Sequence, residues 1–321
     1  MENKLPNTLQ EAIIYFNDPD NALNFVAMLR WPEGPECPKC GSRNLYFLAT
    51  RRIWKCKNKD CRKQFSVKVG TIFEDSPLGL DKWLPAAWLV INCKNGVSSY
   101  ELSRDLRITQ KSCWFMLHRI RLAMQTGTFE KMSGEVEADE TFVGGLARNM
   151  HASRRQKNMI RMGSMAGKTI VMGLIERRGK DKKCSTVRTR IVPDATQSSL
   201  QAVVHSEVEH GSKLYTDEHG GYRNLAFYYT HQRINHAEKY VEGAVHTNGV
   251  ENYWSLLKRT IRGTYVSVEP FHLTRYLDEQ AFRFNYRKLT DGERFMVAMS
   301  QIVGRRVTYR QLTGKVIPVQ P

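Results

Sequence analysis

Four carboxylates crowd one short stretch of the chain, at Glu135, Glu137, Asp139 and Glu140. The β-branched and aromatic residues around them, followed by a Gly-Gly pair, predict a strand that ends in a turn. Because side chains alternate along a strand, the first three carboxylates share one face and Glu140 points to the other. Like charges on one face destabilise a strand unless a cation lies against them. The stretch is therefore a strand that faces a metal ion or basic side chains, or else a solvated acidic edge strand.

Two later segments carry carboxylates that can join this strand. A second predicted strand ends at Asp217, again before a Gly-Gly pair. Farther along, Asn248 is a predicted N-cap, and Glu251 opens the polar face of the helix that follows. Lys258 and Arg262 recur on that face, which suits a metal-binding carboxylate beside a track for phosphates. The alternative for Glu251 is a capping role, because Asn248-x-x-Glu251 is close to a capping box.

The charge balance of the 321-residue chain indicates a polyanionic partner. Lys plus Arg is 49 and Asp plus Glu is 32, which gives a formal net charge of +17. Nucleic acid is the leading partner, and an anionic membrane is the alternative. No apolar run approaches the roughly 20 residues of a spanning helix, and the N-terminus lacks a signal-peptide pattern. We therefore expect a cytoplasmic protein that contacts no membrane and whose cysteines bind metal rather than form disulfides.

Four of the seven cysteines are spaced as ligands of one metal ion. Two close pairs are separated by fifteen residues, which predicts a zinc ribbon with a hairpin between two cysteine-bearing turns. The expected ligands of one Zn²⁺ are Cys37, Cys40, Cys56 and Cys61. Four thiolates leave no open position for a substrate, so this zinc is structural. The alternative is four unrelated buried cysteines, and the basic surface of the segment suits either nucleic acid or solvent.

Residues 81–125 predict three helices with a helix-turn-helix outline, in which Asp81 caps the first and Thr109 caps the third. The face opposite the apolar stripe of the third helix carries Gln110, Lys111, Trp114, His118 and Arg121. Gln110, Lys111 and Arg121 are the candidates to reach base edges or phosphates. An ordinary three-helix bundle with a wet face is the alternative, and the positive net charge favours DNA binding.

The rest of the chain predicts alternating strands and helices. After a basic loop at 147–168, which we expect to be mobile, the predicted elements are strands 169–176 and 186–192, helix 196–207, the Asp217 strand, a short strand near 232–234 and the Glu251 helix. That order, β-β-β-α-β-(β)-α, is typical of ribonuclease-H-like nuclease cores, in which the first strand, the fourth strand and a later helix meet at one metal site. Residues 262–287 predict a helical continuation, and the basic end of the chain predicts an appended arm.

On these motifs the chain resembles DDE-type insertion-sequence transposases of the group with an N-terminal zinc ribbon. The motifs are Val136-Glu-Ala-Asp-Glu-Thr-Phe-Val-Gly-Gly145, Tyr215-Thr-Asp217, His246-Thr-Asn-x-x-Glu-Asn-x-Trp-Ser-x-Leu-Lys-Arg259, Gly263-Thr-Tyr265, Trp31-Pro-x-Gly-x-x-Cys-Pro-x-Cys40 and Phe282-Arg-Phe-Asn285. The resemblance covers about residues 10–290, and several motifs in the right order are more specific than any one of them. We accordingly expect an α/β protein whose ribonuclease-H-like core, a mixed sheet with flanking helices, follows a zinc ribbon and a helix-turn-helix-like domain.

The resemblance implies that Asp139, Asp217 and Glu251 are the catalytic carboxylates, with Asp139 chosen over Glu140. They would hold two Mg²⁺ or Mn²⁺ ions for DNA strand cleavage and for transfer of the cleaved end into target DNA. The partner would be double-stranded DNA, bound by a homo-oligomer of two or more copies. The cations expected to grip phosphates are Lys258, Arg259 and Arg262, and the residues expected to support the site are His246 and Asn248.

Two other functions stay open at this point: a DNA-binding regulator derived from a transposase, and a nuclease that cleaves without joining. The intact carboxylate trio argues against the regulator. The expected division of the chain is residues 1–75 for helices and ribbon, 76–128 for the helix-turn-helix, 129–290 for the catalytic core and 291–321 for a basic tail.

Overall fold

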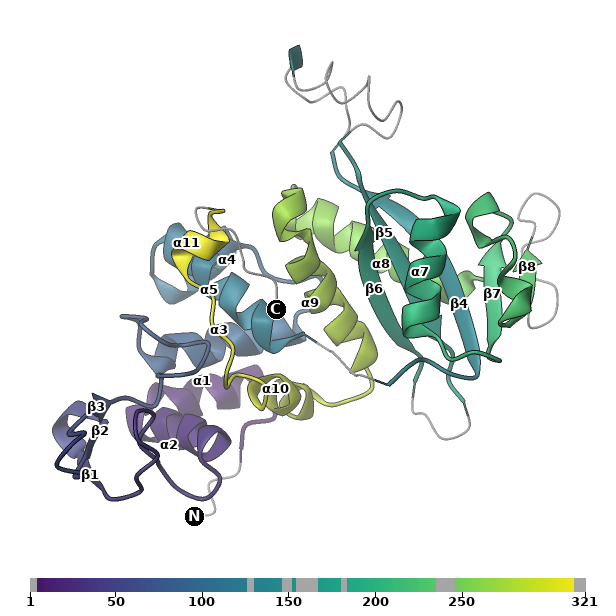
Figure 1. Cartoon of the computed structure of the whole chain (residues 1–321). Helices are drawn as coiled ribbons and strands as arrows, with labels where there is room; N and C mark the ends of the chain where they lie inside the picture. The colour runs from purple at the N-terminus through teal and green to yellow at the C-terminus, as the bar shows by residue number, and fades with distance from the viewer. Residues whose placement is uncertain are drawn as a thin grey trace. The chain divides into compact units, whose positions relative to one another are not determined.

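The chain folds into two compact units (Figure 1). The first unit combines Met1–Gln125 with Leu289–Pro321, and the second is Thr126–Lys288. The computed structural model describes residues 5–125, 130–145, 152–153, 167–179, 184–234 and 246–314. The expected mobile loop at 147–168 falls largely outside these ranges. No helix in the described part of the chain is both long and apolar enough to cross a bilayer.

The first unit begins with two short helices and a small antiparallel sheet. Helix α1 (Leu9–Asn17) starts with a capping box, and α2 (Pro19–Arg30) starts with proline at its first position. Strands β1 (Leu45–Leu48), β2 (Ile53–Cys56) and β3 (Gln64–Phe65) pair in that order. Trp54 lies 5.1 Å from Trp31 and 6.2 Å from Phe65, centroid to centroid, so three rings form the core of the predicted ribbon.

Three helices follow the ribbon, α3 (Leu80–Asn92), α4 (Ser99–Leu106) and α5 (Gln110–Ala123). The Thr109 side chain caps α5 as predicted, and Arg107 in the left-handed region makes the turn before it. The predicted cap at Asp81 is wrong, because α3 starts earlier, with Gly79 as its N-cap. The earlier start brings Leu80 into the buried face that also contains Trp83 and Trp88.

The C-terminal segment belongs to this same unit rather than forming a free arm. Helix α10 (Asp291–Met299) places Phe295 4.9 Å from the Trp88 ring and 5.7 Å from the Phe25 ring. A short helix, α11 (Tyr309–Leu312), follows. The division into 1–75, 76–128 and 291–321 therefore differs from the structure, because one aromatic core joins the three segments.

The second unit is built on one mixed sheet of five strands, in the order β6-β5-β4-β7-β8. The strands are β4 (Glu135–Val143), β5 (Thr169–Glu176), β6 (Thr186–Val192), β7 (Lys213–Asp217) and β8 (Thr230–Ile234). The first three are antiparallel neighbours, whereas β7 runs parallel to β4 and β8 runs parallel to β7. This order confirms the predicted ribonuclease-H-like core.

Helices cover both faces of this sheet (Figure 1). Helix α7 (Gln197–Glu207) packs Leu200 and Val204 against Val136 and Ala138 of β4. Helices α8 (Asn248–Thr260) and α9 (Leu273–Asn285) pack on the other face, which includes Val171 and Ile175 of β5. Val136 and Ala138 thus face α7, and by strand alternation Glu137 and Asp139 face α8.

Residues 262–287 do not form the continuous helix that the sequence predicts. Helix α8 passes into a π-helical turn, Ile261–Tyr265, and ends at Val266, which has a positive φ of 61°. A 3₁₀ turn at Pro270–His272 then leads into α9. Pro270 lacks an N–H and cannot continue a helix begun before it, so the chain restarts there.

The Phe282-Arg-Phe-Asn285 motif at the end of α9 holds this helix in place. The Asn285 side chain accepts a hydrogen bond from Val187 N (2.7 Å) and donates one to Val187 O (3.0 Å) on the edge strand β6. Arg283 forms a buried ion pair with Glu279, at 2.6 Å. The motif is therefore explained by packing and sheet-edge pairing within the second unit.

Candidate active site

Two neighbouring parallel strands bring together Asp139, in the middle of β4, and Asp217, at the carboxyl end of β7. Strands β4 and β7 pair with Glu135 opposite Lys213 and Glu137 opposite Tyr215. If this register is continued by two residues along both strands, Asp139 lies opposite Asp217. The register therefore places two of the three candidate carboxylates on neighbouring strands at the same level of the sheet.

Asp139 occupies an environment that disfavours its own negative charge. Its Oδ2 accepts a hydrogen bond from Trp254 Nε1, at 2.9 Å. Burial, followed by the charges of Glu140 and Asp217, raises the pKa of Asp139 to about 7. A cation placed between these carboxylates would offset both contributions, and oxygen ligands are those that Mg²⁺ and Mn²⁺ prefer.

Glu140 lies on the opposite face of β4, as strand alternation predicts. Its Oε2 accepts a hydrogen bond from Tyr222 Oη at 2.6 Å, and its Oε1 lies 3.6 Å from His219 Nδ1. Burial raises the pKa of Glu140, while the Tyr222 hydroxyl acts to lower it. Glu140 therefore contacts residues that follow β7, whereas Asp139 contacts α8.

Glu251 stands in the first turn of α8 and is exposed to solvent. Its Oε1 accepts a hydrogen bond from Thr247 Oγ1, at 2.9 Å. The predicted N-cap at Asn248 is wrong by one residue, because Asn248 is already helical and Thr247 is the N-cap. Glu251 thus occupies the fourth helical position and not the third, so the capping box proposed from the sequence does not form.

The carboxylates of Asp139, Asp217 and Glu251 do not form one tight cluster in the structure. Within the described ranges, the four cysteines of the ribbon make the one group of three or more ligand atoms that all lie within 4.8 Å of one another. Asp139 and Asp217 are close enough for the charge of one to raise the pKa of the other. Glu251 belongs to the helix whose Trp254 contacts Asp139. The geometry fits two fixed carboxylates and a third on the helix beside them.

The predicted zinc ligands converge in the first unit. Cys37 Sγ lies 3.6 Å from Cys61 Sγ, and Cys40 Sγ lies 3.6 Å from Cys56 Sγ. Although burial acts to raise it, backbone N–H groups of Lys39 and Cys40 lower the pKa of the Cys37 thiol to about 7. Four clustered sulfurs with one acidified thiol are the donor set of a structural zinc site.

The predicted DNA-contacting face of α5 is only partly exposed. Lys111 is exposed and its Nζ lies 4.9 Å from the centre of the Tyr309 ring, while Gln110 Nε2 donates to Ser99 Oγ at 2.8 Å. His118 and Arg121 are 1% and 0% exposed, so the expectation that they lie on a wet face is wrong.

The C-terminal segment, predicted as an appended arm, packs along the same helix. Arg119 Nε donates to Val307 O at 3.2 Å, and the Arg305 guanidinium donates to the carbonyls of Leu122 and Gln125. Because its side chain is fully buried, Arg121 cannot contact DNA in this structure.

The cations of α8 follow the carboxylates along the helix. Arg259 and Arg262 are exposed, and Lys258 is partly buried. Burial and the neighbouring Arg262 lower the pKa of Lys258, while Asp139 acts in the opposite direction. Lys258 is thus close enough to Asp139 for the two charges to interact.

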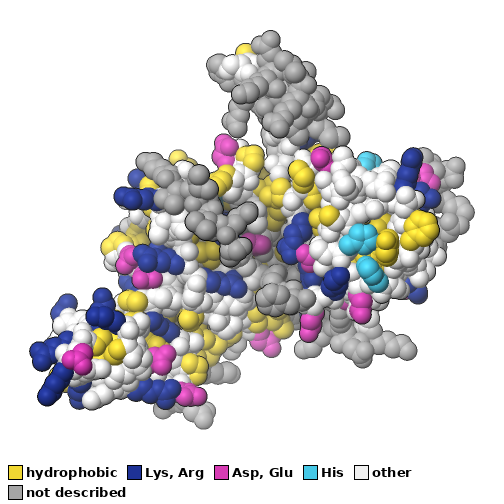
Figure 2. Space-filling view, in the orientation of Figure 1, with side chains coloured by type: hydrophobic (Ala, Val, Ile, Leu, Met, Phe, Trp, Pro, Cys, Tyr) yellow, Lys and Arg dark blue, Asp and Glu magenta, His cyan; other side chains and the backbone are white. Residues whose placement is uncertain are grey.

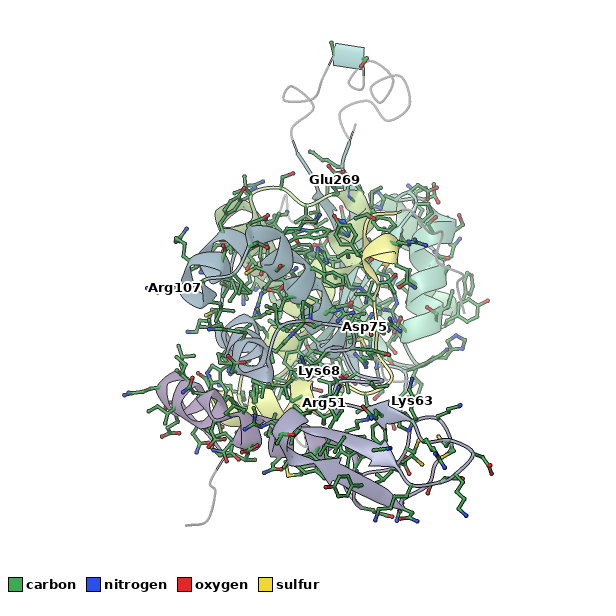
Figure 3. The ribbon with its side chains drawn as sticks, turned by 90° about the vertical axis from the view of Figure 1, so that its left-hand side faces the viewer. Arg51, Lys63, Lys68, Asp75, Arg107 and Glu269 are labelled. Carbon is green, nitrogen blue, oxygen red and sulfur yellow. The ribbon has the colours of Figure 1, made fainter. Side chains whose placement is uncertain are left out.

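A second concentration of positive charge lies over the ribbon. Figure 2 shows Lys and Arg side chains gathered at the ribbon end of the first unit. A pocket of about 420 Å³ lies where the ribbon meets α2 and the start of α3, and its lining includes Arg51, Lys68 and Asp75 (Figure 3). Arg52, also in the lining, pairs with Asp20 at 2.6 Å. The pocket contains none of the three candidate catalytic carboxylates.

Sequence reasoning missed the residue that holds the acidic strand against α8. Arg177 follows the predicted strand 169–176; its Nε lies 2.7 Å from Glu137 Oε1 and its Nη2 lies 2.9 Å from His246 Nδ1. His246 therefore contacts Glu137 and Arg177. Asn248 is exposed at the start of α8. Its position directly after β5, the strand that pairs with β4, is the sequence feature that could have identified Arg177 as a partner of the acidic strand.

A ribonuclease-H-like sheet with acidic residues on adjoining strands, accompanied by a four-cysteine ribbon, defines a class of DNA-processing enzymes. Residues 131–285 match the family model of the ISXO2-like transposase domain, and residues 17–64 match that of the transposase zinc-ribbon domain. The chain belongs to the family of DDE-type insertion-sequence transposases with an N-terminal zinc ribbon.

Two relatives illustrate this membership. An uncharacterized transposase-like protein of Haemophilus influenzae is 32% identical over 104 residues, which cover 32% of this chain and 83% of the relative. An uncharacterized protein in transposable element ISH50 of Halobacterium salinarum is 26% identical over 270 residues, which cover 80% of this chain and 87% of the relative. The similarity to the second relative thus extends over both units.

Proposed function

We propose that this transposase binds the ends of an insertion element and uses Asp139, Asp217 and Glu251 for DNA strand cleavage and strand transfer. The observation that carries the proposal is the juxtaposition of Asp139 and Asp217 on adjoining parallel strands, with the pKa of Asp139 raised to about 7 by burial and by its carboxylate neighbours. Such a shift marks a site at which a cation is favourable.

The three carboxylates would hold two Mg²⁺ or Mn²⁺ ions, because hard divalent cations require oxygen ligands. When bound, such ions supply an activated nucleophile, charge neutralisation on the phosphate and stabilisation of the leaving 3′-oxygen. The protein side chains position the ligands. Trp254 Nε1 orients one oxygen of Asp139, and Thr247 Oγ1 orients one oxygen of Glu251.

Cations of both units would bind the DNA. Lys258, Arg259 and Arg262 follow Glu251 along α8 and would contact phosphates near the reacting bond. In the first unit, Gln110 and Lys111 at the start of α5, and the basic surface of the ribbon, would contact the element end. Because an insertion element has two ends, we expect two or more copies of the chain in the active complex.

The experiment incubates the protein with a labelled duplex of the element's terminal sequence and flanking DNA, in Mg²⁺, together with a circular target. Cleavage at the terminus followed by covalent joining of its 3′-end to the circle is the expected result. Cleavage without joining would reduce the function to that of a nuclease. Specific binding with neither reaction would contradict the proposal in favour of a DNA-binding regulator.

A further inference from the structure

The carboxylates on the acidic face of β4 differ in their partners. Glu135 pairs with Lys213 at 3.2 Å and with Arg177 at 3.5 Å, and it is partly exposed. Glu137 is almost fully buried and pairs with Arg177 at 2.7 Å. Asp139, two residues farther along the same face, accepts its hydrogen bond from the neutral indole of Trp254. Basic side chains therefore lie against the first two carboxylates of this face.

Glu137 also reaches into the first turn of α8. Its Oε2 accepts a hydrogen bond from Val250 N, at 3.0 Å. The first N–H groups of a helix have no partner within it, and here a carboxylate from the sheet supplies one. The bond joins a residue two positions before Asp139 to the residue directly before Glu251.

Helix α8 approaches the Glu137 carboxylate closely at Gly249. A Cβ atom added to Gly249 would lie 2.7 Å from Glu137 Oε2 and 3.0 Å from its Oε1. Any side chain at position 249 would therefore displace the carboxylate or the helix. Glycine at this position is a requirement of the contact between β4 and α8.

Arg177 completes the arrangement from a third segment. Its Nε donates to Glu137, its NH2 donates to the backbone carbonyl of His246 at 2.6 Å, and its guanidinium lies 4.2 Å above the Tyr215 ring of β7. Arg177 thus ties the residues that lead into α8 to β4 and β7, the two strands that carry Asp139 and Asp217. The charge of Glu137 gives this guanidinium a close ion pair, which a neutral amide cannot replace.

We infer that Glu137 is a positioning residue for the transposase reaction. Its buried carboxylate, held by Arg177, fixes the first turn of α8 and thereby sets where Glu251 stands relative to Asp139. The inference rests on the proposed function, because it concerns the same site. Glutamine at position 137 would still accept from Val250 N, but its amide group would then face Arg177 and the pairing would be lost.

The test compares Glu137→Gln and Gly249→Ala with a matched control, Glu135→Gln. The control removes a carboxylate from the same face of the same strand. It loses the longer contact with Arg177, at 3.5 Å, and keeps the bonds of Glu137 to Arg177 and Val250. The readouts are circular dichroism, affinity for end DNA, affinity for Mn²⁺ alone by calorimetry, and cleavage rate at saturating DNA over a Mn²⁺ series. The last separates a slower reaction from weaker substrate binding.

Both test variants should fold and bind end DNA within about twofold of the parent, yet lose about 10–100-fold in cleavage rate or in Mn²⁺ affinity. Glu135→Gln should match the parent throughout. A folded Glu137→Gln protein with the parent's rate and Mn²⁺ affinity would overturn the inference, as would an equal loss in the control. If only one test variant folds, its cleavage rate and Mn²⁺ affinity decide the test. If neither folds, Glu137 is required for folding and the inference fails.

Asp139→Asn, measured alongside, separates this inference from the proposed function. If Asp139→Asn cleaves like the parent, the proposed function itself is wrong. If Asp139→Asn is inactive while Glu137→Gln cleaves like the parent, the carboxylate site stands and only the positioning role fails.

Discussion

Trp254 Nε1 of α8 donates a hydrogen bond to Asp139 Oδ2 of β4, over 2.9 Å. The same indole ring belongs to the buried stripe that packs α8 on the sheet. One side chain therefore both fixes the helix that carries Glu251 and orients a carboxylate at the candidate site. The packing of the second unit and the geometry of its site are consequently linked through a single residue.

Replacing Trp254 with Phe should separate these two roles. The aromatic ring keeps most of the buried contact, while the N–H donor to Asp139 is lost. A hydrogen bond to a charged group contributes about 1.5–3 kcal/mol, and partial solvent exposure reduces this. We expect a modest fall in thermal stability together with a clear fall in cleavage rate. Unchanged cleavage in the folded variant would show that Asp139 needs no orientation from Trp254.

Gly173 of β5 lies opposite Asp139 in the sheet and leaves room for the Trp254 ring. A Cβ atom at this position would lie 2.5 Å from the ring carbon Cζ2. Gly173→Ala should therefore displace the indole and destabilise the second unit by about 1–3 kcal/mol, measured by urea denaturation. Gly179→Ala is the matched control, because a Cβ atom there meets nothing within 4 Å. Equal effects of the two substitutions would refute the packing argument.

The ribbon should depend on one zinc ion held by Cys37, Cys40, Cys56 and Cys61. Structural zinc contributes about 10–16 kcal/mol to small domains of this kind, so its removal should unfold the ribbon. Elemental analysis should find one zinc per chain, and Cys40→Ser should lower both the zinc content and the protection of β1–β3 from proteolysis. Folded, protease-resistant protein that contains no zinc would exclude the site.

Lys111 and Arg121 should behave differently although both lie on α5. Lys111→Ala should weaken binding to the terminal sequence, by about 1–3 kcal/mol if the side chain contacts a base edge. Arg121→Ala should instead lower the stability of the first unit, because Arg121 is fully buried. Lys94→Ala, an exposed lysine between α3 and α4, is the control for a general loss of charge. Equal binding losses for Lys94→Ala and Lys111→Ala would remove α5 from the specific interface.

The sequence predicted the second unit well because its signals are local. Alternation placed Asp139 and Glu140 on opposite faces of β4. The helical spacing of Val250, Trp254 and Leu257 likewise predicts the buried stripe that α8 has in the structure. Strand boundaries such as Thr169–Glu176 follow from short runs of β-branched and apolar residues between turn signals.

Some errors are local, such as the helix starts of α3 and α8. The others concern contacts between segments far apart in the chain. Nothing near Arg121 in the sequence indicates that residues around Arg305 and Val307 pack along α5. Nothing near Glu137 indicates that its partners are Arg177, forty residues later, and Val250, in the first turn of α8. Helical periodicity distinguishes an apolar face from a polar one, but it does not show which polar face another segment will cover.

The most direct test of the carboxylate site compares Asp139→Asn with Glu140→Gln, two neighbouring substitutions that each remove one negative charge from β4. Both proteins are assayed for folding, for binding to end DNA, and for cleavage and joining in Mg²⁺. Asp139 faces α8 and Glu140 faces Tyr222, so Asp139→Asn should fold, bind and lose both reactions, whereas Glu140→Gln should retain measurable cleavage. Normal cleavage by Asp139→Asn, with loss in Glu140→Gln, would contradict the account and move the metal-binding carboxylate to the other face of the strand.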